Sequence, residues 1–283
     1  MNTDNNSVIV ITGPTASGKS ALAVDMALRL DGEVVSADSR QLYKDIPIVT
    51  AAPTEEEMRG VPHHLVGTLS LEENYSAARF EQEALAIIRD IHARGKRAIV
   101  CGGSMMYIDA LCNGIDELPD VPEQLRADLM EEWKQYGDAS MRLRLLGLDP
   151  DYYARVDLDN MKRVFHAVEM SIAAGQPYST LLTGKRVARE FPIEKIFIDM
   201  PREKLFDRIN RRVLLMMETG LEEEARKVYP LRHLNSLNTV GLKEMFAYFD
   251  GTFTLEEAIA RIQKNTRVYA KKQITWHKKT AGV

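Results

Sequence analysis

The feature that most constrains the fold is a glycine-rich turn between a strand-forming run and a helix-forming run near the N-terminus. Four β-branched apolar residues, Val8–Ile11, precede the turn, and residues 21–28 after it have the spacing of a helix. A strand, a turn and a helix in this order form the first half of a parallel β-α-β unit. The turn matches the phosphate-binding pattern G-x-x-x-x-G-K-[ST], with the residues Gly13, Pro14, Thr15, Ala16, Ser17, Gly18, Lys19 and Ser20.

The chemistry of this turn predicts a ligand that carries phosphate groups. Backbone N–H groups of a glycine-rich turn can surround phosphate oxygens, and the N-terminus of the following helix adds partial positive charge. Lys19 supplies a full positive charge, and the hydroxyl of Ser20 can ligate Mg²⁺. We therefore predict that the turn binds a di- or triphosphate, although the pattern does not specify the rest of the molecule.

Composition excludes several other classes of protein. The chain of 283 residues is 45% hydrophobic and 28% charged, as is usual for a globular protein, and its net charge is −4. Any nucleic-acid contact must therefore come from a local basic patch. Two cysteines, Cys101 and Cys112, cannot build a disulfide framework or a cysteine-rich zinc site. The polar N-terminus and the lack of a membrane-length apolar run favour the cytoplasm, and no membrane association is expected.

The first third of the chain alternates strand and helix patterns. We expect strands at Glu33–Asp38 and Arg97–Cys101 and a helix at Ser76–Arg94. Such alternation predicts an α/β fold, a parallel sheet flanked by helices like that of P-loop NTPases. Ligands bind at the carboxyl ends of the strands in such sheets, so the loops that begin at Gly13, Asp38 and Gly102 should share one cleft.

The pattern changes to helices alone after residue 115. Residues 120–183 contain no convincing strand and four helical segments, Pro122–Tyr136, Ala139–Leu146, Pro150–Arg155 and Asp159–Ala174. Strand character returns at Lys195–Asp199. We therefore expect a core domain formed by residues 1–115 and 191–283, with residues 116–190 as an all-helical insertion.

Asp38 is the first candidate for acid–base chemistry, because it ends the second strand beside the phosphate turn. It could hold Mg²⁺ through water, act as a general base on an acceptor, or merely cap its turn. Asp199 also follows an apolar strand, but Met200-Pro201 suggests that it caps a helix. His63-His64 has no third ligand nearby, so a structural role is favoured over a metal site.

Two groups of basic residues could meet anions. Arg208 and Arg212 lie four residues apart on an expected helix and share a face; residues alone favour a solvated surface there over contact with a diphosphate. Seven basic residues and no acidic one fall between positions 261 and 279, interleaved with Tyr269, Trp276 and His277. This pattern suits a phosphate backbone with base stacking, with a plain solvated helix as the alternative.

Together these motifs resemble the tRNA dimethylallyltransferase (tRNA isopentenyltransferase) family, in its bacterial form, over nearly the whole chain. The resemblance is carried by the phosphate turn and by segments in the family's order: Ser36–Tyr43, Pro62–Leu65, Tyr75–Ala78, Gly102–Ser104, Ala167–Glu169, Arg208–Arg212, Val240–Glu244 and Thr266–Trp276. The resemblance implies transfer of a dimethylallyl group from dimethylallyl diphosphate to the exocyclic amine of adenine 37 in tRNA, with a helical insertion that clamps the anticodon arm.

The resemblance also implies roles for individual residues. The diphosphate would lie on Gly13 to Ser20, with Mg²⁺ near Ser20. Asp38 would act as general base, and Arg212 with Lys19 would stabilise the departing diphosphate. Contacts to tRNA, the flipped adenine included, are implied for Asp38, Ser39, Arg40, Gln41, Ser104, Arg126, Lys162, Arg163, Val164, Phe165, His166, Asn238, Thr239, Val240, Gly241, Leu242 and Lys243, and the basic helix adds Arg267, Lys271 and Lys272.

Three positions depart from the family's usual residues: Ala52 stands in place of a lysine, His166 in place of an arginine and Leu242 in place of a tyrosine. Each is in or near an implied tRNA or loop contact, whereas the phosphate turn, Asp38 and Arg212 are intact. Three other functions stay open: prenylation of free adenine nucleotides, phosphate transfer by a small-molecule kinase, and RNA binding without catalysis. A monomer is expected.

Overall fold

The computed structural model describes residues 6–116, 118–184 and 186–281. The chain divides into two compact units, residues 1–113 with 188–283 (unit 1) and residues 114–187 (unit 2). The boundaries expected from the sequence differ from these by two and three residues. None of the described helices combines the length and the apolarity that a membrane crossing requires.

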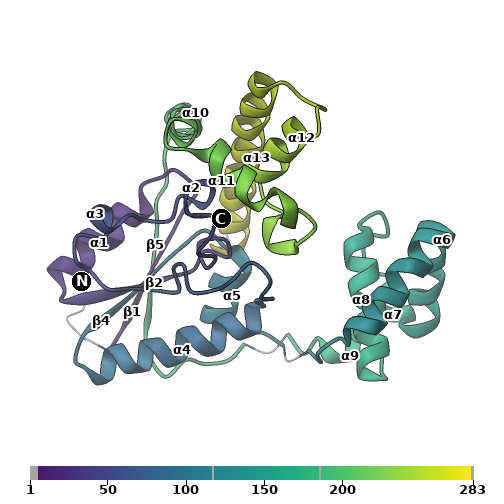
Figure 1. The fold of residues 1–283 in the computed structure, drawn as a ribbon. Helices are drawn as coiled ribbons and strands as arrows, with labels where there is room; N and C mark the ends of the chain where they lie inside the picture. Colours follow the sequence, from purple (N-terminus) through teal and green to yellow (C-terminus); the bar gives the residue numbers. More distant parts are fainter. Residues whose placement is uncertain (1–5, 117, 185, 282–283) are drawn as a thin grey trace. The chain divides into compact units, whose positions relative to one another are not determined.

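Unit 1 is built on a parallel sheet of five strands in the order β3-β2-β4-β1-β5 (Figure 1). Every neighbouring pair is parallel, as the alternating pattern predicted. The strands are β1 (Val8–Thr12), β2 (Gly32–Ser36), β3 (His63–His64), β4 (Arg97–Cys101) and β5 (Ile193–Phe197). The sequence pattern missed β3, because its two residues are too short to show a period.

Helices cover both faces of the sheet because side chains along a strand point alternately to opposite faces. Val8 and Val10 pack with Phe80 of α4 (Ala77–Ala93), whereas Ile9 and Ile11 pack with Val24 of α1 (Lys19–Arg29). Both faces of the central strands are therefore buried, which explains their continuous apolar runs. The other helices before unit 2 are α2 (Pro47–Thr50), α3 (Glu55–Met58) and α5 (Met105–Asn113).

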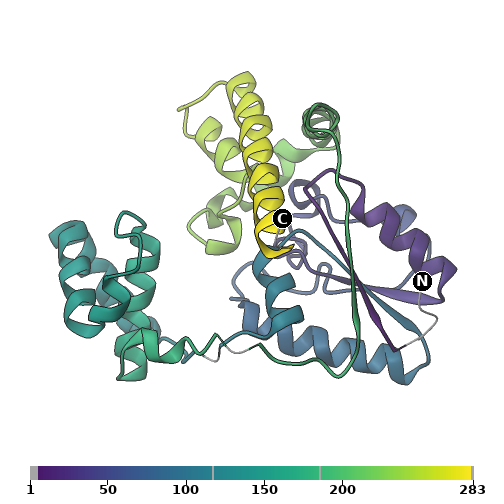
Figure 2. The ribbon, with the colours of Figure 1, turned by 180° about the vertical axis from the view of Figure 1, so that it is seen from behind.

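The C-terminal part of unit 1 is helical and lies at the carboxyl ends of the strands. Its longest helix, α13 (Leu255–Ala281), packs against α10 (Arg202–Glu218) and α12 (Leu242–Phe249) and is yellow in Figure 2. The elements in chain order are α10 (Arg202–Glu218), α11 (Leu221–Val228), the 3₁₀ turns η1 (Tyr229–Leu231) and η2 (Asn235–Leu237), α12 (Leu242–Phe249) and α13 (Leu255–Ala281).

The regular elements of unit 2 among its described residues are helices, namely α6 (Glu123–Leu148), α7 (Pro150–Tyr153), α8 (Met161–Ala174) and α9 (Tyr178–Leu181). Helix α6 joins the first two expected segments, but Gly137 has non-helical backbone angles (φ 73°, ψ −172°) that kink it at the expected break. Leu129, Met141 and Leu145 of α6 pack against Val164 and its neighbours on α8, so the unit has its own core.

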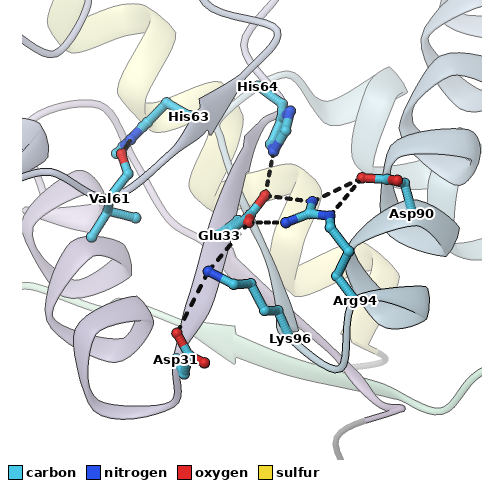
Figure 3. Close-up of polar contacts among 8 residues, drawn as sticks. All are labelled: Asp31, Glu33, Val61, His63, His64, Asp90, Arg94 and Lys96. Atoms are coloured by element: carbon cyan, nitrogen blue, oxygen red, sulfur yellow. Dashed lines mark hydrogen bonds and ion pairs between the residues drawn. The ribbon is translucent and has the colours of Figure 1, made fainter.

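A charge network ties the amino end of β2 to the end of α4, at the opposite end of the parallel strands from the phosphate turn. The carboxylate of Glu33, buried in the sheet, accepts hydrogen bonds from Arg94 and from Nε2 of His64 at 2.8 Å (Figure 3). Lys96 lies 3.6 Å from the same carboxylate. His63 instead bonds the Val61 carbonyl at 2.8 Å, so the two histidines are structural, as predicted.

These contacts, above all the bond from Arg94, lower the pKa of Glu33 to about 2 from its ordinary 4.5. A depressed carboxyl pKa contributes stability that is present above the unfolded pKa and is lost as the pH falls toward the folded one. We expect Glu33→Gln to lower the free energy of unfolding by about 2 kcal/mol at pH 7, the usual scale for hydrogen bonds to a charged group. Urea unfolding at pH 7, 4 and 3 should show the deficit shrink with acidity. Glu72→Gln, at an exposed site, should show no deficit, and a deficit for Glu33→Gln that does not change with pH would contradict this account.

Candidate active site

The phosphate turn connects β1 to α1 in the conformation that its glycines permit. Gly13 (φ 154°) and Gly18 (φ 97°) have positive φ, and a Cβ on Gly13 would lie 2.9 Å from the Ile198 carbonyl oxygen. Ala16 also has a positive φ of 64°, which is uncommon for a residue with a side chain. The turn is therefore held in a defined shape before any ligand binds.

Two polar groups of the turn are buried and poised for a ligand. The ammonium of Lys19 donates to the Pro14 carbonyl at 2.8 Å, and burial lowers the pKa of Lys19, partly opposed by the charge of Asp38. The hydroxyl of Ser17 is buried and has no hydrogen-bond partner among the described residues. An anion in the turn would satisfy the Ser17 hydroxyl and would add negative charge beside the desolvated ammonium of Lys19.

Arg212 of α10 reaches the turn from outside. Its guanidinium donates to the hydroxyl of Thr15 at 2.5 Å, and its Nε atom is buried without a partner among the described residues. Burial lowers the pKa of Arg212, again opposed by Asp38. Arg208, one helical turn earlier, lies 3.5 Å from the place where a Cβ on Gly18 would be. Arg212 therefore meets the phosphate turn, which residues alone did not favour, whereas Arg208 beside it stays exposed. Arg211 forms an exposed ion pair with Asp207.

Asp38 lies where β2 ends, opposite the phosphate turn. Its Oδ1 atom accepts the N–H of Arg40 at 2.9 Å, so Asp38 does cap its turn. Among the described residues, none donates a hydrogen bond to Oδ2 of Asp38. That oxygen is therefore available to a group of an acceptor substrate. The capping role and the chemical role are thus compatible, since they use different oxygens of one carboxylate.

The side chains that follow Asp38 hold neighbouring loops. The guanidinium of Arg40 donates to the Ser236 carbonyl at 2.8 Å and to two further carbonyls of the same segment. Gln41 accepts from the hydroxyl of Ser36 and donates to the Ala51 carbonyl at 2.9 Å. The backbone of Ser39 donates to the hydroxyl of Ser104 at 2.7 Å. Arg40, Gln41 and Ser104 therefore shape the surroundings of Asp38.

A cavity of about 330 Å³, here named the Asp38 cavity, brings these elements together. Its walls come from the phosphate turn, the end of β2, α2, α10, α13 and the segment before α12, so residues far apart in the sequence share it. The lining residues are Thr15, Asp38, Ser39, Arg40, Val49, Thr50, Arg212, Asn238, Thr239, Val240, Lys243, Thr266 and Tyr269. The cavity is within the size range of small-molecule sites.

Sequence reasoning missed two buried residues that hold this site together. Glu224 of α11 accepts the N–H groups of Ile48 and Val49 at 2.7 and 2.8 Å, and so anchors α2 at the wall of the Asp38 cavity; burial raises its pKa. Gln273 of α13 accepts the N–H of Thr15. Glu224 has no signal in the sequence, because it ends an ordinary acidic run. Gln273 lies within the Thr266–Trp276 segment that carries the resemblance, but nothing local assigns it a role.

The basic residues of α13 lie beside α10. The cations of Arg267 and Lys271 lie 5.9 and 5.5 Å from the centre of the Phe206 ring, and Arg202 lies over the same ring. Arg267 also donates to the side chain of Asn210. Lys271 and Lys272 are exposed, so they remain available to an external anion.

In unit 2, the predicted contact residues separate into exposed and buried ones. Arg126 and His166 both bond the same oxygen of buried Glu169, at 2.9 and 3.0 Å, while both keep exposed surface. Lys162 and Arg163 are exposed at the start of α8.

Three of the predicted tRNA contacts need correction. The side chains of Val164 and Phe165 lie in the core of unit 2, because the amphipathic helix α8 turns them inward, and Leu242 is fully buried in unit 1. These side chains cannot contact a macromolecule at the surface. Among their neighbours, Asn238 and Lys243 are exposed, and Gly241 has a φ of 102° and abuts Val49.

The two other metal candidates, Asp199 and the His63-His64 pair, form no metal site among the described residues. Asp199 accepts the N–H of Met200 at 2.9 Å, but the residue that caps α10 is Pro201, so the expectation of a helix cap was wrong. Across the described ranges, no three His, Cys, Asp or Glu side chains gather where they could hold a metal ion.

A family model described as IPP transferase matches residues 41–280. The chain belongs to this family. The match to the family model begins just after Asp38. The alignment with a full-length relative described below covers the phosphate turn as well. A protein named tRNA dimethylallyltransferase 1 from Phocaeicola vulgatus is 50% identical over 278 residues, 98% of this chain and 93% of that protein. One named tRNA dimethylallyltransferase 2 from Porphyromonas gingivalis is 48% identical over 283 residues, 100% and 94% of the two chains.

Solved structures agree with this assignment and confirm the fold class. A full-length tRNA isopentenylpyrophosphate transferase from Bacillus halodurans has a TM-score of 0.68 and 38% identity, covering 96% of this chain and 87% of that one. A eukaryotic dimethylallyltransferase described as acting on tRNA has a TM-score of 0.82 and 30% identity, covering 96% and 69%.

The geometry of this IPP transferase family member predicts that inorganic diphosphate binds the phosphate turn. We expect Lys19→Met to weaken that binding at least tenfold, because it removes a buried positive charge, and Arg208→Met to weaken it several-fold. Isothermal titration with diphosphate and Mg²⁺ measures both. Lys227→Met, at an exposed site on α11, is the control, and equal affinities in all three variants would place the anion elsewhere.

Proposed function

We propose that this chain transfers a dimethylallyl group from dimethylallyl diphosphate to the exocyclic amine of adenine 37 in tRNA, next to the anticodon, and releases diphosphate. One observation carries the proposal. The Asp38 cavity joins a carboxylate with an unbonded oxygen to Thr15 and Arg212 of the phosphate-binding side. A base for the acceptor and a cation for the leaving group therefore line one space large enough for a nucleobase.

The reaction follows from those positions. The allylic carbon–oxygen bond breaks and its electron pair goes to the diphosphate, while the amine nitrogen forms a bond to the same carbon. The amine proton passes to Oδ2 of Asp38. Arg212 and Lys19 stabilise the charge that develops on the diphosphate, and both are partly stripped of water, which strengthens that interaction. An aromatic amine is a weak nucleophile, so a carboxylate within hydrogen-bond reach contributes directly.

The donor set fits Mg²⁺ that binds together with the diphosphate. Ser20 is exposed in the first turn of α1, and the described residues offer no cluster of ligands that would hold a metal alone. Mg²⁺ commonly takes one or two protein ligands together with phosphate oxygens and water. When bound, the ion would neutralise charge on the diphosphate, with Ser20 as its protein ligand.

Recognition of tRNA is proposed for exposed polar residues of both units. In unit 1 these are Asn238, Lys243, Lys271 and Lys272, and in unit 2 they are Arg126, Lys162, Arg163 and His166. Unit 2 would contact the anticodon arm. Arg40, Gln41 and Ser104 would act on the adenine through the loops that they hold, because their polar groups are already bonded to protein.

The three departures from the family's usual residues differ in their surroundings. His166 bonds Glu169 and packs edge-on against Tyr178, so it keeps a polar link that an arginine could also make. Leu242 is buried, and the backbone N–H of Ala52 bonds the Pro47 carbonyl at 3.0 Å. We therefore infer that His166 is the departure most able to alter the affinity for tRNA.

The decisive experiment is a transfer assay with labelled dimethylallyl diphosphate, Mg²⁺ and an unmodified anticodon stem-loop. We expect label in the stem-loop and none in AMP. Asp38→Asn should lower kcat by roughly 10² to 10⁴, the range for loss of a general base, while the stem-loop still binds. Asparagine keeps the oxygen that caps the turn, so the change isolates the proton acceptor. Asp45→Asn, at an exposed site, should leave kcat unchanged.

Other outcomes of the same assay contradict the proposal. Label in AMP alone would identify an enzyme that prenylates free nucleotides. Phosphorylation of an acceptor by ATP without prenyl transfer would identify a kinase. Full activity of Asp38→Asn would remove Asp38 from its role as base.

A separate prediction concerns the basic helix. Changing Lys271 and Lys272 together to Ala should weaken stem-loop binding and reduce the slope of log affinity against log salt by about one to two, because each phosphate contact releases counterions. Changing Lys44 and Lys227 together to Ala should leave the slope as it is. Fluorescence anisotropy between 50 and 300 mM salt measures both, and an unchanged slope for the first pair would return α13 to an ordinary solvated helix.

A further inference from the structure

Gln273 is a buried amide in the middle of the basic segment of α13. Only 5% of its surface is exposed, and both ends of its amide are hydrogen-bonded. A polar side chain that is buried and fully satisfied in this way stabilises one arrangement of its partners over others. Its two partners are the phosphate turn and the loop after β4.

The first partner is the phosphate turn. The Oε1 atom of Gln273 accepts the N–H of Thr15 at 2.8 Å. Since the hydroxyl of Thr15 accepts from Arg212 at 2.5 Å, the residue is held at its backbone by α13 and at its side chain by α10. The N–H of Thr15 is thereby bonded to Gln273. The bond from Arg212 to the Thr15 hydroxyl keeps the guanidinium at the Asp38 cavity, which both residues line.

The second partner is the loop after β4. The Nε2 atom of Gln273 donates to the Gly103 carbonyl at 2.8 Å, and a Cβ on Gly103 would overlap that nitrogen. The ammonium of Lys19 lies 3.9 Å from the same Cβ position. A glycine is thus required for the amide of Gln273 to approach, and the amide and the ammonium converge on one point of this loop.

The helix that carries Gln273 also forms part of the Asp38 cavity. Tyr269 and Thr266 line the cavity one and two turns earlier on α13, respectively, and the hydroxyl of Tyr269 lies 3.5 Å from the Gly103 carbonyl oxygen. Helix α13 therefore connects the cavity wall to the phosphate turn, and Gln273 makes the hydrogen bonds of that connection beside the apolar packing of Ala270 and Ile274 with Ala16. Displacements of about 1 Å at a reacting centre cost up to 10²-fold in rate, so such a connection bears directly on catalysis.

We propose that Gln273 is a positioning residue that couples α13 to the phosphate turn and sets the places of Thr15, Arg212 and Lys19 relative to Asp38. This inference rests on the proposed function for its effect on turnover. Gln273 touches neither the acceptor amine nor the breaking bond in this account; it acts through the residues that do.

The test compares Gln273→Met with Gln263→Met. Both glutamines lie on α13, but among the described residues the side chain of Gln263 bonds only the Asn210 carbonyl, at 3.3 Å. We expect Gln273→Met to lower kcat by 10- to 100-fold, to weaken inorganic diphosphate binding about fivefold and to leave the KM for the stem-loop within twofold. Gln263→Met should leave all three unchanged. The assays are run at least 15 °C below the melting temperature of the less stable variant.

The variant Gly103→Ala disturbs the same contact at its other partner, because the added Cβ would overlap the amide of Gln273. If the contact carries the effect, the loss of kcat in the double variant should equal that of the more impaired single variant, because one interaction is lost only once. Losses that multiply in the double variant would overturn the proposal, as would unchanged kcat and diphosphate affinity in Gln273→Met. A wild-type protein that binds diphosphate but transfers no prenyl group would refute the proposed function alone, since diphosphate titration would still decide the role of Gln273.

Discussion

The close approach of the loops that end β1, β2 and β4 is the constraint on which the candidate site depends. A Cβ on Gly102 would overlap the backbone of Ala37, and one on Gly13 would press on the Ile198 carbonyl. Parallel strands bring their carboxyl ends to one edge, but only glycines allow the loops to come this near. The phosphate turn and Asp38 are therefore neighbours because of backbone contacts that exclude side chains.

Much of the polar chemistry around this edge maintains the site. Arg40, Gln41, Ser104, Glu224 and Gln273 each bond backbone groups of a loop that lines or supports the Asp38 cavity. Ser104, Glu224 and Gln273 are buried, and a buried polar group is costly unless it is hydrogen-bonded; each of the three is bonded to a loop backbone. The groups that keep unbonded atoms, Asp38, Ser17 and Arg212, are those to which we assign ligand or proton contacts.

The charged side chains divide into interior ones beside the candidate site and exposed ones on helix surfaces. Lys19 and Arg212 are buried close enough to Asp38 for its charge to oppose the lowering of their pKa values. The exposed cations of α13 and α8 stand on helix surfaces, where water and salt weaken single contacts. The interior charges are thus suited to a small, highly charged ligand, and the surface charges are suited to a long phosphate backbone.

The sequence by itself determined the parallel α/β core, the phosphate turn, the place of Asp38 at the end of a strand, the longer helices, and a helical insertion, which it placed at residues 116–190. These features follow from local signals, namely apolar periodicity and glycines at defined spacing, which act within about twenty residues. Tertiary structure alone decided that Arg212 meets Thr15 across 197 positions of sequence and Gln273 meets Thr15 across 258. It also buried Val164, Phe165 and Leu242, which a linear motif cannot distinguish from their exposed neighbours. The reason is physical: a pattern along one chain specifies which face of an element is apolar, whereas the partner of each polar side chain depends on where all the other elements pack.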